Sequence, residues 1–174
     1  ADDGLLHGTY YAQIDVKDYG TITAELYADT APITVTNFVN LVNQGFYDGL
    51  TFHRIISGFM IQGGDPLGNG TGGSENKIKG EFSANDVDNP LKHTRGVLSM
   101  ARSSAYNSAS SQFFIMHADA THLDGQYAAF GKVLSGMEVV DAICQNTPVT
   151  DSNGTVAKEN QPVITSIRMI DKPQ

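Results

Sequence analysis

Short segments in which apolar and polar residues alternate recur along most of the chain, and this alternation restricts the fold more than any other feature. Residues 10–16 and 21–27 alternate in this way, and residues 17–20 between them form a predicted hairpin turn. The other predicted strands are residues 51–56, 59–62, 97–100, 113–117, 128–133 and 163–170. Many short strands separated by Gly and Asp or Asn clusters are typical of an antiparallel barrel or sandwich.

Two segments have the periodicity of a helix instead. In the first, Pro32 stands at a first helical position, Gly45 supplies the stop, and the apolar residues fall on one face, at Val35, Phe38, Val39 and Val42. The second begins at residues 135–138, where Ser135 and Glu138 have the spacing of a capping box. Its apolar stripe consists of Met137, Val140, Ile143 and Cys144.

Each one-sided helix needs an apolar surface to cover. Eight strands and two such helices therefore predict a mainly β fold, a barrel whose open ends are plugged by the helices. The 174 residues fit one domain, 1–174, with its core at about residues 10–170.

Composition limits the partners and the location. Apolar residues make up 40% of the chain and charged residues 17%, and the formal net charge is −8 with no run of Lys or Arg, so nucleic acid is not expected as a partner. No stretch approaches the roughly 18 apolar residues of a membrane span. We expect a soluble monomer, either cytoplasmic or exported, since the start Ala1-Asp2-Asp3 is compatible with a processed N-terminus.

Several short motifs suggest other chemistry but lack the required context. Residues 68–73 match G-x-G-x-x-G, yet no apolar helix follows them, so they are interpreted as a surface loop. Residues 151–155 resemble the start of a calcium loop, but Val156 stands where Gly is required, which favours a turn. The histidines lack metal-site spacing, and Cys144 is the one cysteine and is expected to be buried. We expect neither a metal nor a cofactor.

The most informative segment runs from Phe52 to Asp65. It places Arg54 in an otherwise apolar strand, where a guanidinium is costly to bury unless it is paired or functional, although a surface arginine would have the same pattern. Met60 and Gln62 share one strand face, as Gln112 and Phe114 do in residues 111–115. Apolar surface with amide groups and one cation is typical of a groove for a neutral peptide.

These segments resemble the signature segments of the cyclophilin family. The resemblance rests on residues 52–65, 111–115, 123–125 and 130–133, and on Ala31-Pro32 leading to Asn37-Phe38, in the order of the family, and it extends from about residue 10 to 170. It implies an eight-stranded antiparallel β-barrel capped by two α-helices. It also implies a peptidyl-prolyl cis/trans isomerase that acts on Xaa-Pro bonds and assists protein folding, with proline-containing peptides and client proteins as partners.

The resemblance also assigns roles to residues. The implied catalytic residues are Arg54, Phe59, Gln62 and Phe114. The implied substrate-binding residues are Met60, Ala101, Arg102, Gln112, His122, Leu123 and Tyr127.

Three of these positions depart from the family pattern. Arg102 replaces a common asparagine, Tyr127 replaces a histidine, and His122 stands where many members carry a tryptophan that donates a hydrogen bond to cyclosporin. We therefore expect weak cyclosporin binding. The same departures leave an alternative open, in which the domain is a proline-peptide binding or chaperone module with weak or no turnover.

Overall fold

The computed structural model describes residues 4–173, so the start at residues 1–3, on which the hypothesis of a processed N-terminus depends, lies outside the described residues. The strands are β1 (Thr9–Val16), β2 (Gly20–Tyr27), β3 (Phe52–Ile56), β4 (Met60–Gly63), β5 (Val97–Met100), β6 (Phe113–Met116), β7 (Ala129–Ser135) and β8 (Ile164–Ile170). The helices are α1 (Pro32–Asn43) and α2 (Met137–Asn146), with short 3-10 helices at Ser83–Asn85, Thr121–Leu123 and Lys158–Asn160. Each predicted strand and helix is present, with strand ends shifted by at most two residues.

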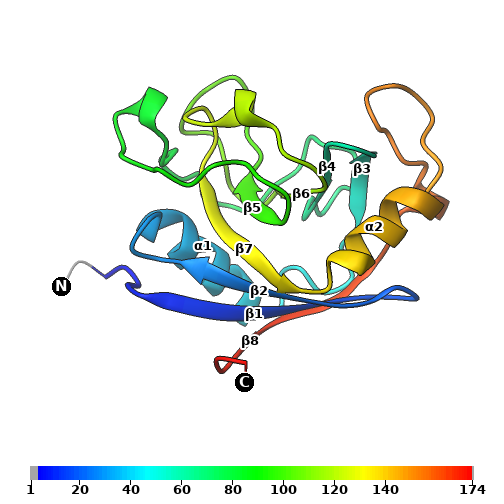
Figure 1. Ribbon diagram of the computed structural model, residues 1–174, viewed down its shortest axis with the longest axis horizontal. Coiled ribbons are helices and arrows are strands. Elements are labelled where there is room, and N and C mark those ends of the chain that lie inside the picture. Colours follow the sequence, from blue (N-terminus) through cyan, green and yellow to red (C-terminus); the bar gives the residue numbers. More distant parts are fainter. Residues whose placement is uncertain (1–3, 174) are drawn as a thin grey trace.

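The eight strands form one antiparallel sheet in the order β3-β4-β6-β5-β7-β2-β1-β8. The sheet curls until its edge strands meet at the bridge between Thr51 and Val163, next to a hydrogen bond from Ile164 N to Leu50 O of 2.7 Å. In Figure 1, β7 connects the group of β3 to β6 with the group of β1, β2 and β8. The predicted barrel with two helices is confirmed.

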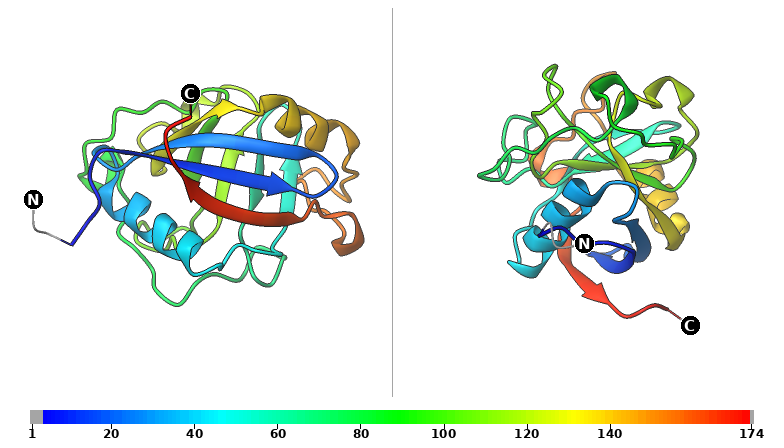
Figure 2. Two further views of the ribbon diagram at one scale, coloured as in Figure 1. Left: turned by 90° about the horizontal axis from the view of Figure 1, so that it is seen from below. Right: turned by 90° about the vertical axis from the view of Figure 1, so that its left-hand side faces the viewer.

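Alternation explains which side chains enter the barrel. On β1, Ala12, Ile14 and Val16 point inward and are buried, while the residues between them are partly exposed. The two helices lie at opposite ends of the curled sheet (Figure 2). From α1, the ring of Phe38 lies 5.2 Å from the ring of Phe130 and 5.6 Å from that of Phe113, so α1 closes one end with aromatic packing.

Two strands bury both faces, which positions the candidate site. All residues of β5 and β6 are buried. Their outer face carries a second apolar cluster, separate from the barrel core, which consists of Met60, Val97, Phe114, Met116, Ala120, Leu123 and Ala129. Partly buried Phe59, Ala101 and Tyr127 pack against this cluster. An apolar surface therefore lies outside the barrel, under the loops that follow β4, β5 and β6.

The two helix starts differ from each other. Pro32 is the first residue of α1, and Gly45 has φ 72° just after the helix, as predicted. The capping box predicted for α2 is wrong: Ser135 belongs to β7, and Gly136 is the N-cap with φ 101° and no side-chain cap. The turn is too tight for any other residue, because a Cβ at Gly136 would collide with the carbonyl oxygen of Thr21.

A buried carboxylate from another part of the chain caps α1. Glu81 is 2% exposed, and its side chain accepts hydrogen bonds from Ile33 N (3.2 Å), Thr34 N (2.7 Å) and Thr34 Oγ1 (2.6 Å). The unsatisfied N–H groups and the positive end of the helix dipole favour a carboxylate at this place. Within residues 4–173, neither helix is long and apolar enough to cross a membrane.

Glu81→Ala should lower the free energy of unfolding by about 2–3 kcal/mol, because it removes a charged acceptor from buried N–H and O–H donors. Urea denaturation measures the change. The matched control is Glu138→Ala, since Glu138 is an exposed carboxylate in the first turn of α2 and should cost less than about 1 kcal/mol. Equal effects of the two substitutions would contradict the capping role of Glu81.

Candidate functional site

An apolar pocket of about 120 Å³ lies on the second cluster, outside the barrel. It is lined by Arg54, Phe59, Met60, Gln62, Ala101, Arg102, Phe114, Leu123 and Tyr127. Every one of these residues belongs to the predicted site. The apolar side chains come from the second cluster and from the residues packed on it, so the pocket is a gap in a covered hydrophobic surface.

The guanidinium of Arg54 is held at the wall of this pocket. Its Nη1 donates to Gln62 Oε1 (3.2 Å), its Nε to the backbone oxygen of Asn153 (2.8 Å) and its Nη2 to Asn153 Oδ1 (3.2 Å). A guanidinium has five N–H donors. Three of them are used within the described part of the chain, so two have no protein partner there.

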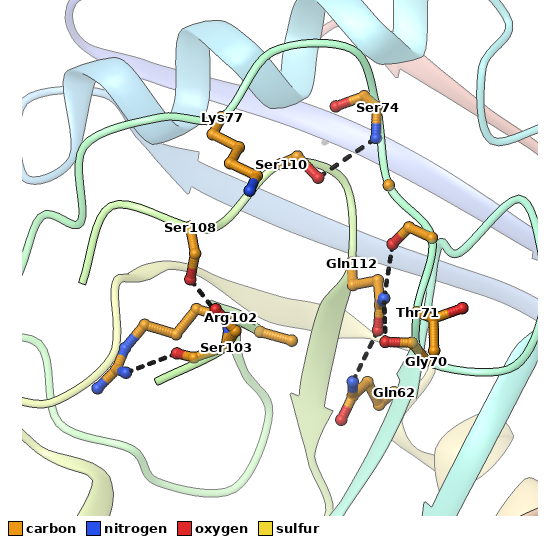
Figure 3. A pocket seen from close by; sticks show the side chains of 13 residues that line it. Gln62, Gly70, Thr71, Ser74, Lys77, Arg102, Ser103, Ser108, Ser110 and Gln112 are labelled. Atoms are coloured by element: carbon orange, nitrogen blue, oxygen red, sulfur yellow. Dashed lines mark hydrogen bonds between the residues drawn. The ribbon is translucent and has the colours of Figure 1, made fainter. Parts of the chain in front are cut away.

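A chain of amides fixes the orientation of Gln62. Gln62 accepts from Arg54 and donates through Nε2 to Gln112 Oε1 (2.9 Å). Gln112 Nε2 in turn donates to the carbonyl oxygens of Gly72 (2.8 Å) and Gly70 (3.1 Å), as Figure 3 shows. Because each amide is oriented by its neighbour, the oxygen of Gln62 faces the guanidinium and keeps it in place.

A second, more polar cavity of about 300 Å³ adjoins the apolar pocket. Residues 70–74 form one side of it, and residues between 101 and 110 contribute to the other side. Gln62 and Gln112 lie between the two sides (Figure 3). Gln62, Ala101 and Arg102 line both cavities. The two cavities therefore form one groove, with an apolar and a polar compartment.

The family model of the cyclophilin type peptidyl-prolyl cis-trans isomerases matches residues 11–169. The chain belongs to the cyclophilin family. The predicted family, fold and enzyme class are thereby confirmed.

Curated relatives and solved structures agree with this membership. The chain is 48% identical over 139 residues to a peptidyl-prolyl cis-trans isomerase of Helicobacter pylori, an alignment that covers 79% of this chain and 82% of the relative. It is 47% identical to peptidyl-prolyl cis-trans isomerase B of Bacillus subtilis over 144 residues, 83% of this chain and 92% of the relative.

Among solved structures, a cyclophilin type isomerase of Cryptosporidium parvum superposes with a TM-score of 0.83 at 32% identity and covers 95% of this chain and 100% of its own. A second crystal structure of that isomerase, in the presence of the dipeptide Ala-Pro, has a TM-score of 0.81 at 33% identity and covers 93% of this chain and 99% of its own.

Arg102, the first departure from the family pattern, is clamped among aromatic rings. Its guanidinium carbon lies 4.6 Å from the ring centre of Tyr127, 5.0 Å from Phe82 and 5.1 Å from Tyr106. Nη2 also donates to the backbone oxygen of Gln126 (2.6 Å). The side chain therefore packs against Tyr127, whose ring meets Phe114 edge to face at 5.9 Å.

The structure separates two predicted binding residues from the apolar pocket. Gln112 lines the adjoining polar cavity and reaches the pocket through Gln62. His122 is exposed and does not line the pocket; its ring lies 5.8 Å from that of Phe59, behind the pocket wall.

Sequence reasoning missed Asn153, which anchors Arg54 from 99 residues away. The turn interpreted from residues 151–155 pairs with the outer edge of β3, where Ile55 N donates to Gly154 O (2.8 Å) and Val156 N to His53 O (3.1 Å). Gly154 has φ 83°, and a Cβ there would collide with the carbonyl oxygen of Ile55. The turn is thus held close enough for Asn153 to reach the guanidinium, and no local pattern signals this.

A buried Ser-His-Asp arrangement was also missed. His93 Nδ1 lies 3.0 Å from Asp124 Oδ1 and His93 Nε2 lies 2.8 Å from Ser99 Oγ, while its ring stacks on Phe114 at 6.1 Å. Ser99 is completely buried, so its hydroxyl is not accessible as a nucleophile. The arrangement supports the wall of the pocket from behind.

The glycine-rich segment is a folded loop, as predicted. The Asp65 carboxylate accepts hydrogen bonds from Leu67 N (2.8 Å), Asn69 N (3.1 Å) and Gly70 N (2.6 Å). Burial alone would raise the pKa of Asp65, but the hydrogen bonds from these backbone N–H groups and that of Gly72 lower it. The amides that would cradle a phosphate in a nucleotide-binding loop are thus occupied by the carboxylate of Asp65.

Two further interpretations concern metals and the thiol. No group of three or more His, Cys, Asp or Glu side chains is placed to hold a metal ion within the described residues. Cys144 is buried as expected, and burial raises the pKa of its thiol to about 11.

Unfolding should become easier as the pH falls from about 7.5 to 5.5. Burial lowers the pKa of both His53 and His93 in the folded protein, and for His93 the carboxylate of Asp124 offsets part of this effect. Below the ordinary histidine pKa of about 6.5 the unfolded chain therefore binds more protons than the folded one, so stability is lost as the pH falls. Urea denaturation at several pH values above 5, where carboxylates stay ionised, measures this slope. A free energy of unfolding that is constant over this range would contradict it.

Proposed function

We propose that this cyclophilin accelerates rotation about Xaa-Pro bonds with Arg54 as the catalytic donor. The observation that carries the proposal is the guanidinium held by Gln62 and Asn153 at the wall of the apolar pocket, with two N–H groups left for a ligand. A proline ring fits the apolar compartment formed by Phe59, Met60, Phe114 and Leu123. The Ala-Pro dipeptide present with the Cryptosporidium isomerase supports the same substrate class for this chain.

The chemistry needs no bond cleavage. The barrier of about 18–20 kcal/mol is the loss of amide resonance as the C–N bond twists. In the twisted state the proline nitrogen regains its lone pair and becomes a better hydrogen-bond acceptor. A guanidinium fixed beside it therefore binds the transition state more tightly than the planar ground state, which is the condition for rate acceleration.

The magnitudes are consistent with one oriented donor plus a shaped pocket. Uncatalysed isomerisation takes about 10–100 s. A turnover of about 10³ s⁻¹ would need roughly 6–7 kcal/mol of transition-state stabilisation. One preorganised donor supplies about 3–4 kcal/mol. Burial of the proline ring and contacts with the peptide must supply the remainder.

Main-chain groups beside the pocket support the proposed peptide contacts. Ala101 N donates to Gln112 O at 3.0 Å, which fixes this segment along the groove. The backbone N–H and carbonyl of Arg102 make no hydrogen bond to any residue between 4 and 173, so both are free to pair with an extended peptide. This role uses only the main chain, so an arginine in place of the usual asparagine is compatible with it.

Arg54→Ala should lower kcat/KM on an Ala-Pro peptide at least a hundredfold, because it removes the donor to the twisted nitrogen. Exchange spectroscopy by NMR measures the rate, and Arg168→Ala, a change at an exposed arginine of β8, is the matched control. A near-wild-type rate in Arg54→Ala would refute the role. If the wild-type protein itself binds a proline peptide without exchange broadening of its cis and trans signals, the binding or chaperone module is the better description.

We also propose weak cyclosporin binding, because the exposed His122 replaces the tryptophan expected of many family members. Calorimetry should give a Kd well above the nanomolar range. His122→Trp should lower this Kd at least tenfold, because it restores an indole N–H donor. His7→Trp, at a distant exposed position, controls for a nonspecific effect of the indole. Nanomolar binding by the unchanged protein would contradict this proposal.

We propose that residues 1–174 act as one domain and as a monomer on proline-containing peptides and protein clients. The net charge of −8 argues against nucleic acid as a partner.

A further inference from the structure

A third cavity, of about 640 Å³, lies on the other side of Arg54. Its walls are β3, the loop of residues 67–70 and the segment of residues 153–161. Arg54 and Gln62 line both this cavity and the apolar pocket. These two side chains therefore form part of the wall between a ligand in one cavity and a ligand in the other.

The charges that face this cavity are positive. Arg54 and Lys158 are the charged residues that line it, and no carboxylate does so within residues 4–173. The carboxylate of Asp65 is not part of the lining, and hydrogen bonds from three backbone N–H groups of the loop offset part of its negative charge, which still acts on His53. This is unusual on a protein whose net charge is −8, and it favours an anionic ligand.

The neutral side chains of the cavity present donors. Asn153 Oδ1 accepts from Arg54 Nη2 (3.2 Å), and Asn69 Oδ1 accepts from Thr71 N (2.9 Å). Because the oxygen ends are occupied, each amide has its NH₂ group left for a ligand. The polar groups that remain available here are therefore those that would bind an oxyanion.

One buried side chain at the cavity has no partner. His53 lines the cavity and is 5% exposed, and neither of its ring nitrogens has a hydrogen-bond partner among the described residues. A Cβ at Gly70, which lines the same cavity, would lie 3.8 Å from His53 Nε2. A buried polar group without a partner is costly, and a ligand that accepts one N–H from this ring would remove the cost.

We propose that this cavity binds the carboxylate or phosphate group of an acidic side chain in the client peptide, within about three residues of the proline. The inference rests on the proposed function, because the proline anchors the peptide in the adjoining pocket. An extended chain advances about 3.4 Å per residue, so such a side chain can reach across the wall shared by the two cavities. Charge-assisted hydrogen bonds to Arg54 and Lys158 would hold the anion, and a small shift of the loop at Gly70 would let it also accept the His53 N–H, which is buried beneath that loop.

Matched Ala-Pro peptides test the proposal. Each pair differs only in Glu or Gln at one position, one to three residues before or after the proline, and a phosphoserine peptide forms a third arm. NMR titration should give a Kd about three- to tenfold lower for Glu than for Gln at one of these positions, and at least as low for phosphoserine. The ring signals of His53 should shift with the Glu peptide and stay unchanged with the Gln peptide.

Two variants locate the effect. Lys158→Gln should reduce the Gln-to-Glu ratio of Kd values toward one, whereas Lys132→Gln makes the same charge change at an exposed residue of β7 and should keep the ratio. Equal affinities for Glu and Gln at every position, or a ratio that survives Lys158→Gln, would overturn the proposal. Free inorganic phosphate that binds as tightly as the Glu peptide and shifts His53 equally would overturn the assignment to a client side chain.

The failure of this inference is distinguishable from failure of the proposed function. Isomerisation of the Gln peptides reports the enzyme activity by itself. The Gln-to-Glu ratio of Kd values reports the cavity, whether or not the peptide is turned over.

Discussion

The placement of one guanidinium beside an apolar pocket is the constraint on which the site depends. Arg54 enters from β3, at the edge of the sheet, where a strand would otherwise expose unpaired backbone groups. The segment of residues 153–156 covers that edge, and in doing so it brings Asn153 to the guanidinium. Protection of the edge strand and orientation of the guanidinium are therefore achieved by the same contact.

The pocket exists because the sheet buries more than its inner face. Strands β5 and β6 are buried on both sides, with the barrel core within and the second apolar cluster outside. Phe114 belongs to that outer cluster and is supported from behind by His93, which Asp124 and Ser99 hold in turn. A wall supported in this way keeps the shape of the pocket beside the guanidinium fixed, which a mobile surface loop could not do.

The departures from the family pattern are explained locally. Arg102 stacks against three rings and leaves its main chain free, so the substitution stiffens the pocket wall without filling the pocket. His122 packs beside Phe59 from the outside. Neither change touches the chain of hydrogen bonds from Arg54 through Gln62 to Gln112, which is why the departures do not argue against turnover.

The sequence by itself determined the strands, the helices, the family and every residue that lines the apolar pocket, because alternation, helical periodicity and long ordered motifs are local properties. It could not determine how α2 begins. Glycine is necessary at position 136 because any side chain there would collide with Thr21 of β2, which is distant in the sequence. Nor could it find Asn153 and Glu81, whose partners lie far away along the chain, or the cavity at His53, whose walls come from segments that are separate in the sequence. Only the tertiary structure decided these contacts, because they arise where the curled sheet brings separate loops together.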